Sequence, residues 1–126
     1  MRSAAAAAWE DLRKTWPKAR AIAVICGPGN NGGDGYEIAR LAKAARREVR
    51  VGQVGVAPKS GDAATTRAGF LKDGGKIKPW SSEVSFDGCD VVVDALFGIG
   101  LSRPLQGESL AVIEAMNRCG IPKLAV

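Results

Sequence analysis

The sequence contains no histidine and no pair of closely spaced cysteines. Without histidine, the chain lacks the commonest metal ligand and the commonest general base of enzymes. Its three cysteines, Cys26, Cys89 and Cys119, are odd in number and far apart, so they form no Cys-x-x-Cys motif. We interpret them as small buried side chains in a reducing compartment, which predicts a cytoplasmic protein.

Long apolar runs are also absent. No stretch approaches the roughly 20 apolar residues that a membrane-spanning helix needs, and the alanine run 4–8 lacks the apolar core of a signal peptide, so we expect no membrane partner. The 126 residues suffice for one domain, and 46% hydrophobic residues suffice for a core. The net charge is +5, but no aromatic residues interleave with the densest basic cluster, Arg46, Arg47 and Arg50, so nucleic acid is an unfavoured partner.

Glycine, by contrast, is concentrated in one place. Five glycines lie between Gly27 and Gly35, after the apolar run 21–26 and before a helical pattern that we expect to begin near Tyr36. Such density supplies no core, and it predicts a sharp turn or close approach of the backbone to a ligand. A glycine-rich turn that opens a helix directs several N–H groups and the positive end of the helix dipole at one spot, which suits a phosphate.

The polar residues of this segment allow two interpretations. Asn30, Asn31 and Asp34 could bind hydroxyl groups or a cation, or the segment could be a structural turn in which Asp34 caps the helix. The spacing Gly27-x-Gly29-x-x-Gly32 matches the dinucleotide fingerprint. However, residues 54–58 contain no acid to hold a ribose, which disfavours an ordinary NAD-dependent oxidoreductase, and no Gly-Lys-Ser/Thr follows, which excludes a Walker A loop.

Strand-like and helical patterns alternate along the chain with short connections. We expect strands over 21–26, 49–54, 77–80 (an edge strand, because it contains Pro79), 89–97 and from 123, and helices over 3–16, 36–46, 62–73 and 108–119. This alternation predicts an α/β fold with a parallel sheet covered by helices on both faces. The commonest strand order, 3-2-1-4-5, would bring the loops after strands 1 and 4 together over one ligand crevice.

The loop after the fourth strand carries its own polar groups. Asp94 ends an apolar strand, so its carboxylate needs either a cation or hydrogen-bond donors, and Asn30 or Asn31 could contribute to either arrangement. The alternative is a strand-end aspartate that caps the facing loop. Arg103 could grip a phosphate or ribose, or it could be a solvated loop arginine.

The segments 27–35 and 90–107 together resemble the YjeF N-terminal domain of the NAD(P)H-hydrate epimerase family, and the resemblance covers nearly the whole chain. It implies a Rossmann-like three-layer sandwich with a mainly parallel central sheet, a single domain over 1–126 and a homodimer. The implied activity is the interconversion of the R and S epimers of hydrated NADH and NADPH, NAD(P)HX. An ADP-dependent or ATP-dependent NAD(P)H-hydrate dehydratase, often fused in bacteria, would be the partner that restores the cofactor.

The same resemblance implies site residues. One potassium ion per subunit would be held by Asn31 and Asp94. Asp34 is a candidate catalytic acid or base, although the family's acidic residue after the fifth strand, which would follow Val126, is a better one. The substrate would contact both glycine-rich loops, at Asn30, Asn31, Gly32, Gly33, Asp34, Gly98, Ile99, Gly100, Leu101, Ser102, Arg103 and Pro104.

The two ends of the chain depart from the family pattern. The start resembles an interior stretch of the family's N-terminal region, and the end at Val126 precedes the family's Asp-Ile-Pro-Ser-Gly motif. We therefore expect an incomplete domain with weak or no activity. The alternative function is a non-catalytic nucleotide-binding or dimerising scaffold of the same fold.

Overall fold

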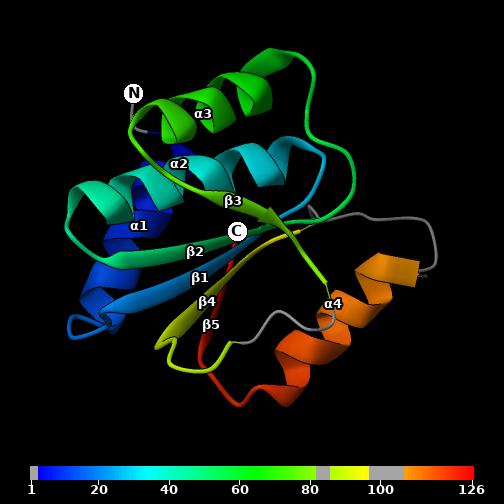
Figure 1. Cartoon of the computed structure of the whole chain (residues 1–126). Coiled ribbons are helices and arrows are strands. Elements are labelled where there is room, and N and C mark those ends of the chain that lie inside the picture. The colour runs from blue at the N-terminus through cyan, green and yellow to red at the C-terminus, as the bar shows by residue number, and fades with distance from the viewer. Residues whose placement is uncertain (1–2, 82–85, 97–106) are drawn as a thin grey trace.

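The computed structural model describes residues 3–81, 86–96 and 107–126, which form a parallel sheet and the helices that cover it (Figure 1). The described elements follow the chain in the order α1 (Ala4–Thr15), β1 (Ala21–Cys26), α2 (Asn30–Ala44), β2 (Glu48–Gln53), α3 (Gly61–Lys72), β3 (Ile77–Pro79), β4 (Val91–Ala95), α4 (Gly107–Arg118) and β5 (Lys123–Ala125). The predicted α/β class and alternation are confirmed.

The strands lie in the order β3-β2-β1-β4-β5, and every neighbouring pair is parallel. The predicted order 3-2-1-4-5 is therefore confirmed, with β3 and its Pro79 at one edge. Strand β1 is buried along its full length because it lies between β2 and β4 and both of its faces are covered. This explains its continuous apolar sequence, since a central parallel strand has no solvent face.

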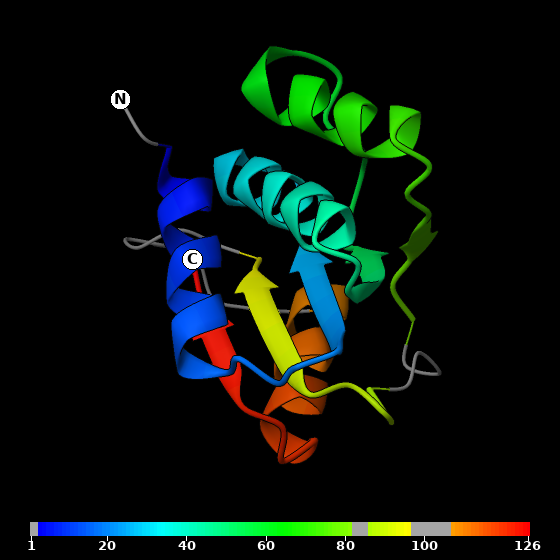
Figure 2. The same cartoon turned by 90° about the vertical axis from the view of Figure 1, so that its left-hand side faces the viewer.

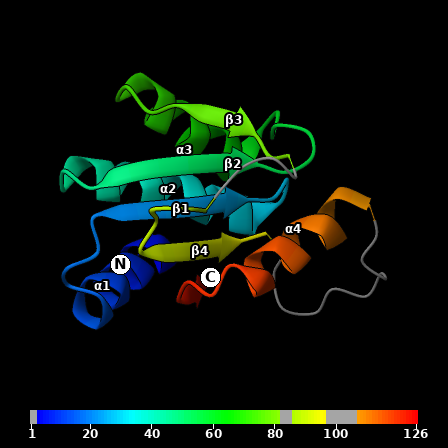
Figure 3. The same ribbon diagram turned by 60° about the horizontal axis from the view of Figure 1, so that its bottom comes forward.

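Two apolar cores lie on opposite faces of the sheet. One core joins alternate residues of β1 and β4, such as Ile22 and Val93, to α1, α2 and α3, and includes Leu12 and Phe70. The other joins the intervening residues, such as Ile25, to Val112 and Met116 of α4. Figure 3 shows α4 beside the end of β4, on the side of the sheet opposite α2 and α3, and no helix of the described residues in front of β2 and β3. The predicted three-layer sandwich is confirmed. Among the described elements, its second helical layer consists of α4.

The start of the first helix agrees with its sequence signals. Ser3 is the N-cap of α1, and its side chain accepts a hydrogen bond from the Ala6 N–H at 3.1 Å. Ala5, Trp9 and Leu12 form its buried face, as the spacing of apolar residues predicts.

The predicted start of the second helix was wrong. Helix α2 begins at Asn30 and not near Tyr36, so the polar and glycine residues that we interpreted as a loop form its first two turns. The interpretation of Asp34 as a helix cap is also wrong, because the N-cap is Gly29. Glycine disfavours an isolated helix by up to about 1 kcal/mol per residue, but tertiary contacts that only glycine permits outweigh this propensity here.

Candidate functional site

The carboxyl ends of β1 and β4 lie side by side where the glycine-rich segment begins. Ile25 is paired with Asp94 and Cys26 with Ala95, and the Gly27 N–H donates to the Ala95 carbonyl at 3.0 Å. A Cβ atom on Gly27 would lie 2.0 Å from the carbonyl oxygen of Leu96, so only glycine allows the two strand ends to approach this closely.

The next glycines place the start of α2 against this edge. A Cβ atom on Gly32 would lie 1.9 Å from the Gly27 carbonyl oxygen, one on Gly33 2.8 Å from the Ala63 Cα of α3, and one on Gly35 2.7 Å from the Cys26 Sγ. Gly32, Gly33 and Gly35 are buried. The expectation that these glycines supply no core was therefore wrong, because they form the interface of α2 with the sheet and with α3.

The start of α2 presents backbone donors and little negative charge. Gly29 forms the N-cap with no side-chain hydrogen bond, and the first turn contains no acidic residue. The Gly32 N–H donates to the Gly29 carbonyl at 3.1 Å, and the helix dipole is positive at this end. The side chain of Asn30 is exposed at the same end. This geometry fits an anion, as the glycine spacing predicts.

Asn31 and Asp94 are each hydrogen-bonded to the backbone of Val126 at this edge. The Asn31 Nδ2 donates to the Val126 carbonyl at 2.6 Å, and the Val126 N–H donates to the Asp94 carbonyl at 3.0 Å. One carboxylate oxygen of Asp94 accepts from the Leu96 N–H at 3.1 Å, and the residue is half-buried. Asp94 therefore brings a carboxylate to this edge, and oxygen ligands of this kind suit a hard cation.

The described residues give no support for a divalent or transition-metal centre. Among the described residues, no group of three or more His, Cys, Asp and Glu side chains is placed to hold a metal ion. The thiol of Cys26 is buried under α2, and burial raises its pKa, so it is a neutral packing group rather than a thiolate ligand. All three cysteines are free; Cys26 and Cys89 are buried, as predicted, whereas Cys119 is only partly buried.

Asp34 lies in the second turn of α2 and is half-buried. Burial raises the pKa of its carboxyl group above the usual range. A carboxyl group with a raised pKa is better suited to donate and accept protons near neutral pH than an ordinary surface aspartate. The structure thus places the candidate acid or base on the helix that carries the proposed anion site.

A polar cluster beneath the glycine helix was not predicted. The side-chain oxygen of Gln53, at the end of β2, accepts from the Tyr36 hydroxyl at 3.2 Å and from Arg67 Nε at 2.9 Å. The Arg67 guanidinium lies 6.0 Å from the centre of the Tyr36 ring. Burial, and secondarily the neighbouring Cys26 thiol, raise the pKa of Tyr36 to about 12, so its hydroxyl remains a donor. These residues come from three elements, and no spacing in the sequence indicates that they meet.

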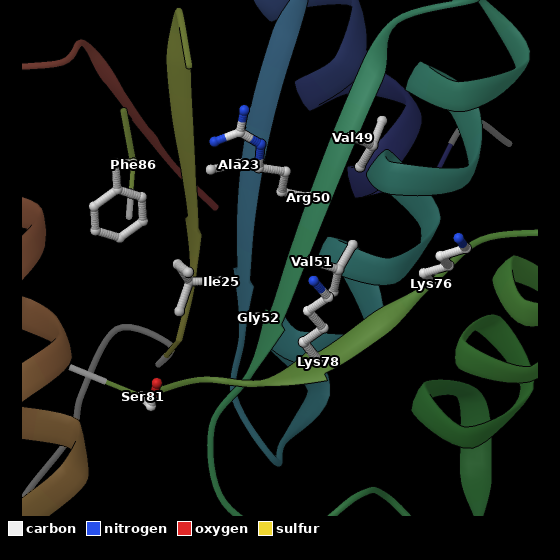
Figure 4. Close-up of a pocket in the computed structure, with 10 residues that line it drawn as sticks. All are labelled: Ala23, Ile25, Val49, Arg50, Val51, Gly52, Lys76, Lys78, Ser81 and Phe86. Carbon is white, nitrogen blue, oxygen red and sulfur yellow. The ribbon is translucent and has the colours of Figure 1, made fainter. Parts of the chain in front are cut away.

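The other predicted site residues lie elsewhere or outside the description. The second glycine-rich segment, with Gly98, Ile99, Gly100, Leu101, Ser102, Arg103 and Pro104, lies outside the described residues, and its role stays a prediction. A hollow of about 530 Å³ lies on the open face of β1, β2 and β3, with Ile25 and Phe86 on its apolar lining and Arg50 and Lys78 around it (Figure 4). It is on the sheet face away from α2, so it is separate from the site at the carboxyl ends of β1 and β4, which we call the carboxyl-edge site.

The chain matches one protein family and several named proteins. The family described as YjeF-related protein N-terminus matches residues 1–126. A Rhodobacter capsulatus protein named NAD(P)H-hydrate epimerase is 38% identical over 98% of this chain and 58% of its own length. A Limosilactobacillus fermentum protein of the same name is 35% identical over 100% of this chain and 60% of its own length.

One further relative and one solved structure extend the comparison. The Escherichia coli bifunctional NAD(P)H-hydrate repair enzyme Nnr is 40% identical over 100% of this chain and 24% of its own length. The crystal structure of the yeast protein ynu0, YNL200c, matches 97% of this chain and 56% of its own with a TM-score of 0.85 and 20% identity, which shows the shared fold. The chain spans less than two thirds of the length of each relative.

Proposed function

The chain belongs to the family of YjeF-related protein N-termini, and we propose that it acts in the repair of hydrated NADH and NADPH by interconverting their R and S epimers. Support comes from relatives named NAD(P)H-hydrate epimerase that match this chain over its whole length. The observation that carries the proposal is the start of α2, without a side-chain cap, held by glycine contacts against the ends of β1 and β4. In open α/β sheets, dinucleotides bind at this edge.

The first turn of α2 would bind the phosphate groups of NAD(P)HX through backbone N–H groups, with Asn30, Asn31, Gly32, Gly33 and Asp34 in contact with the substrate. The segment Gly98–Pro104 would complete the site from the end of β4. Holding the hydrated ring in one orientation relative to a catalytic group accounts for a large part of such rate enhancements.

The oxygen atoms of Asn31 and Asp94 would bind one potassium ion per subunit. The bound ion would supply a fixed positive charge at the carboxyl edge. For this arrangement the Asn31 side chain would turn its oxygen toward the ion, while Asp94 keeps its hydrogen bond to the Leu96 N–H. Both residues would then position the loops rather than carry out chemistry.

Asp34 is our candidate for the proton transfers. In its protonated form it would donate a proton to the hydroxyl group that leaves C6 of the hydrated ring as water. The resulting carboxylate would take a proton from the water that adds to the opposite face. The enzyme and the proton count then return to their starting state, and only the configuration at C6 has changed.

The test is conversion of purified R-NADHX to the S epimer, measured by chromatography against the spontaneous rate. We expect Asp34→Asn to lower the catalysed rate by roughly 10²–10⁴. Asp62→Asn, which alters an exposed carboxylate in the first turn of α3, is the matched control and should leave the rate unchanged. Titration with ADP-ribose should show that both variants still bind the nucleotide.

The result also separates the epimerase from the scaffold alternative. A protein that binds ADP-ribose but never exceeds the spontaneous rate would be a non-catalytic nucleotide-binding or dimerising domain. Full activity in Asp34→Asn would show that another residue carries the proton transfers.

The proposed partner is an ADP-dependent or ATP-dependent NAD(P)H-hydrate dehydratase, because the E. coli and Coxiella burnetii relatives are named bifunctional repair enzymes. We further propose a homodimer, which sedimentation at several protein concentrations would detect. No helix of the described residues combines the length and apolar character that crossing a membrane requires.

A further inference from the structure

Cationic side chains gather at the edge of the sheet where the strands begin, opposite the carboxyl-edge site. Figure 2 views the molecule from this side. Two adjoining hollows, of about 910 and 480 Å³, share Arg46, Arg47 and Glu48 in their linings. We call them together the amino-edge groove. Six of the 18 cations of the chain line it, namely Lys18, Arg20, Lys43, Arg46, Arg47 and Lys76.

Within the described residues, the charge of the amino-edge groove is only partly balanced: the Asp90 carboxylate accepts from the Arg20 N–H at 2.8 Å, and five further cations line the groove. Glu48 is the carboxylate in its described lining, and the Glu48 Oε1 lies 3.6 Å from Nη2 of Arg50, two residues further along β2. Of the ion pairs formed between described residues, none involves any of the six groove cations. Like charges held this close repel each other, so the groove favours a partner of opposite charge.

One groove cation is held in place before any partner arrives. Arg47 donates a hydrogen bond to the Ala19 carbonyl, and its guanidinium lies 6.0 Å from the centre of the Trp9 ring. This arrangement fixes a planar donor group beside the turn that precedes β1. A fixed guanidinium loses less side-chain freedom when it binds a carboxylate than a mobile one.

Arg46 occupies a backbone position that favours glycine. Its φ is 64°, its N–H donates to the Lys43 carbonyl, and the next N–H, of Arg47, donates to Ala42. The end of α3 has the same hydrogen-bond pattern: the Gly74 N–H donates to the Leu71 carbonyl, and the Gly75 N–H donates to the Phe70 carbonyl. There Gly74, with a φ of 90°, takes the position that Arg46 has after α2. Gly120, which follows α4, also has a positive φ, of 70°. The chain therefore has a cation in the groove at the end of α2, where the ends of α3 and α4 have glycine.

We propose that the amino-edge groove is a docking surface for an acidic polypeptide segment. Carboxylates of such a segment would pair with the arginine side chains, and its aliphatic parts would contact Pro17, Ala45 and Val49 at the lining. A second copy of this chain is a poor occupant, because the chain itself carries a net charge of +5. Single-stranded nucleic acid is also disfavoured, because the aromatic residue of the described lining, Phe70, is buried and cannot stack on a base.

The experiment measures binding of a fluorescent hexaglutamate peptide by anisotropy, together with the melting temperature of each variant. We expect Arg46→Gly to weaken peptide binding by about two- to fivefold and to raise the melting temperature by about 2–4 °C, because glycine fits the left-handed backbone. Arg46→Gln should weaken binding equally without that rise, and Arg46→Lys should restore binding.

Lys59→Gln is the matched control, because it removes one exposed cation from the connection between β2 and α3, outside the groove. It should leave peptide binding unchanged. The proposal is overturned if Lys59→Gln weakens binding as much as Arg46→Gln, because attraction would then follow net charge alone. It is also overturned if neither Arg46 variant affects binding, or if a six-phosphate oligonucleotide binds more tightly than the peptide at the same salt concentration.

Discussion

The two edges of the central sheet are built from different kinds of group. At the carboxyl edge, Gly27 and Gly32 bring backbone atoms of three segments together, and at the amino edge long cationic side chains such as Arg20 and Lys43 line open hollows. Backbone groups held by close contacts can present a fixed array of donors to a ligand. Exposed cations are mobile and act over longer distances, and they suit attraction of a partner more than orientation of a reacting atom. The difference shows how one sheet can support two separate kinds of recognition.

The test with the largest expected effect adds a methyl group to the backbone at the carboxyl edge, by the substitution Gly32→Ala. We expect Gly32→Ala to destabilise the protein by about 3–5 kcal/mol, because its Cβ would lie 1.9 Å from a backbone oxygen that cannot move aside. Gly29→Ala is the control, since its Cβ would meet no atom within 4 Å, and should cost less than about 1 kcal/mol. Both changes in the free energy of unfolding would be measured by urea unfolding. Equal and small effects would contradict the view that close packing builds this edge.

The second test asks whether the carboxyl edge binds a cation. Saturating potassium should stabilise the wild type by about 2–3 kcal/mol relative to the free protein, if the ion is present at 100 times its dissociation constant. Asp94→Ala should abolish the potassium-dependent rise in melting temperature. Asp90→Asn alters a carboxylate that precedes β4 at the amino end of the sheet, and it should retain the rise. An unchanged potassium response in Asp94→Ala would count against the shared site of Asn31 and Asp94.

The smallest expected effect is on the pH dependence of stability, and it comes from one carboxyl group near each edge of the sheet. The Ala21 and Arg20 N–H groups lower the pKa of Asp90, so its contribution to stability is present above its ordinary pKa and disappears as the pH falls through the lower, folded value. Burial raises the pKa of Asp34, so its effect has the opposite sign: the protein gains stability below the ordinary pKa and loses it as the pH rises through the folded value.

Unfolding free energies measured between pH 3 and 7 would separate the two groups. Asp90→Asn should reduce the loss of stability at acid pH, and Asp34→Asn should remove the loss on raising the pH above the ordinary aspartate range. Slopes of the same sign for the two variants would be inconsistent with the opposite shifts.

Much of the fold could be predicted because local patterns match the tertiary arrangement. The apolar run 21–26 is a central strand, Pro79 lies on the edge strand, and Ser3 caps α1. The short alternating connections also predicted the strand order. The start of α2 could not be predicted from local preferences, because glycine disfavours a helix unless another segment lies against it.

The candidate site was predictable to a smaller extent. Asn31 and Asp94 were expected together because adjacent parallel strands end at the same edge, and the structure links them through Val126. The cluster of Tyr36, Gln53 and Arg67 was missed, since its members lie on three elements and each is common in ordinary helices and strands.

By itself, the sequence determined the class of the fold, the order of its elements and the two glycine-rich segments, because these depend on periodicity and on residue types that restrict the backbone locally. Only the tertiary structure decided which glycines are contact points between segments, and that the cations at the starts of different strands form one groove. The physical reason is that both depend on distances between segments. A missing Cβ matters only where another backbone lies within van der Waals range, and a charge acts together with others only where the folded chain brings them to one surface.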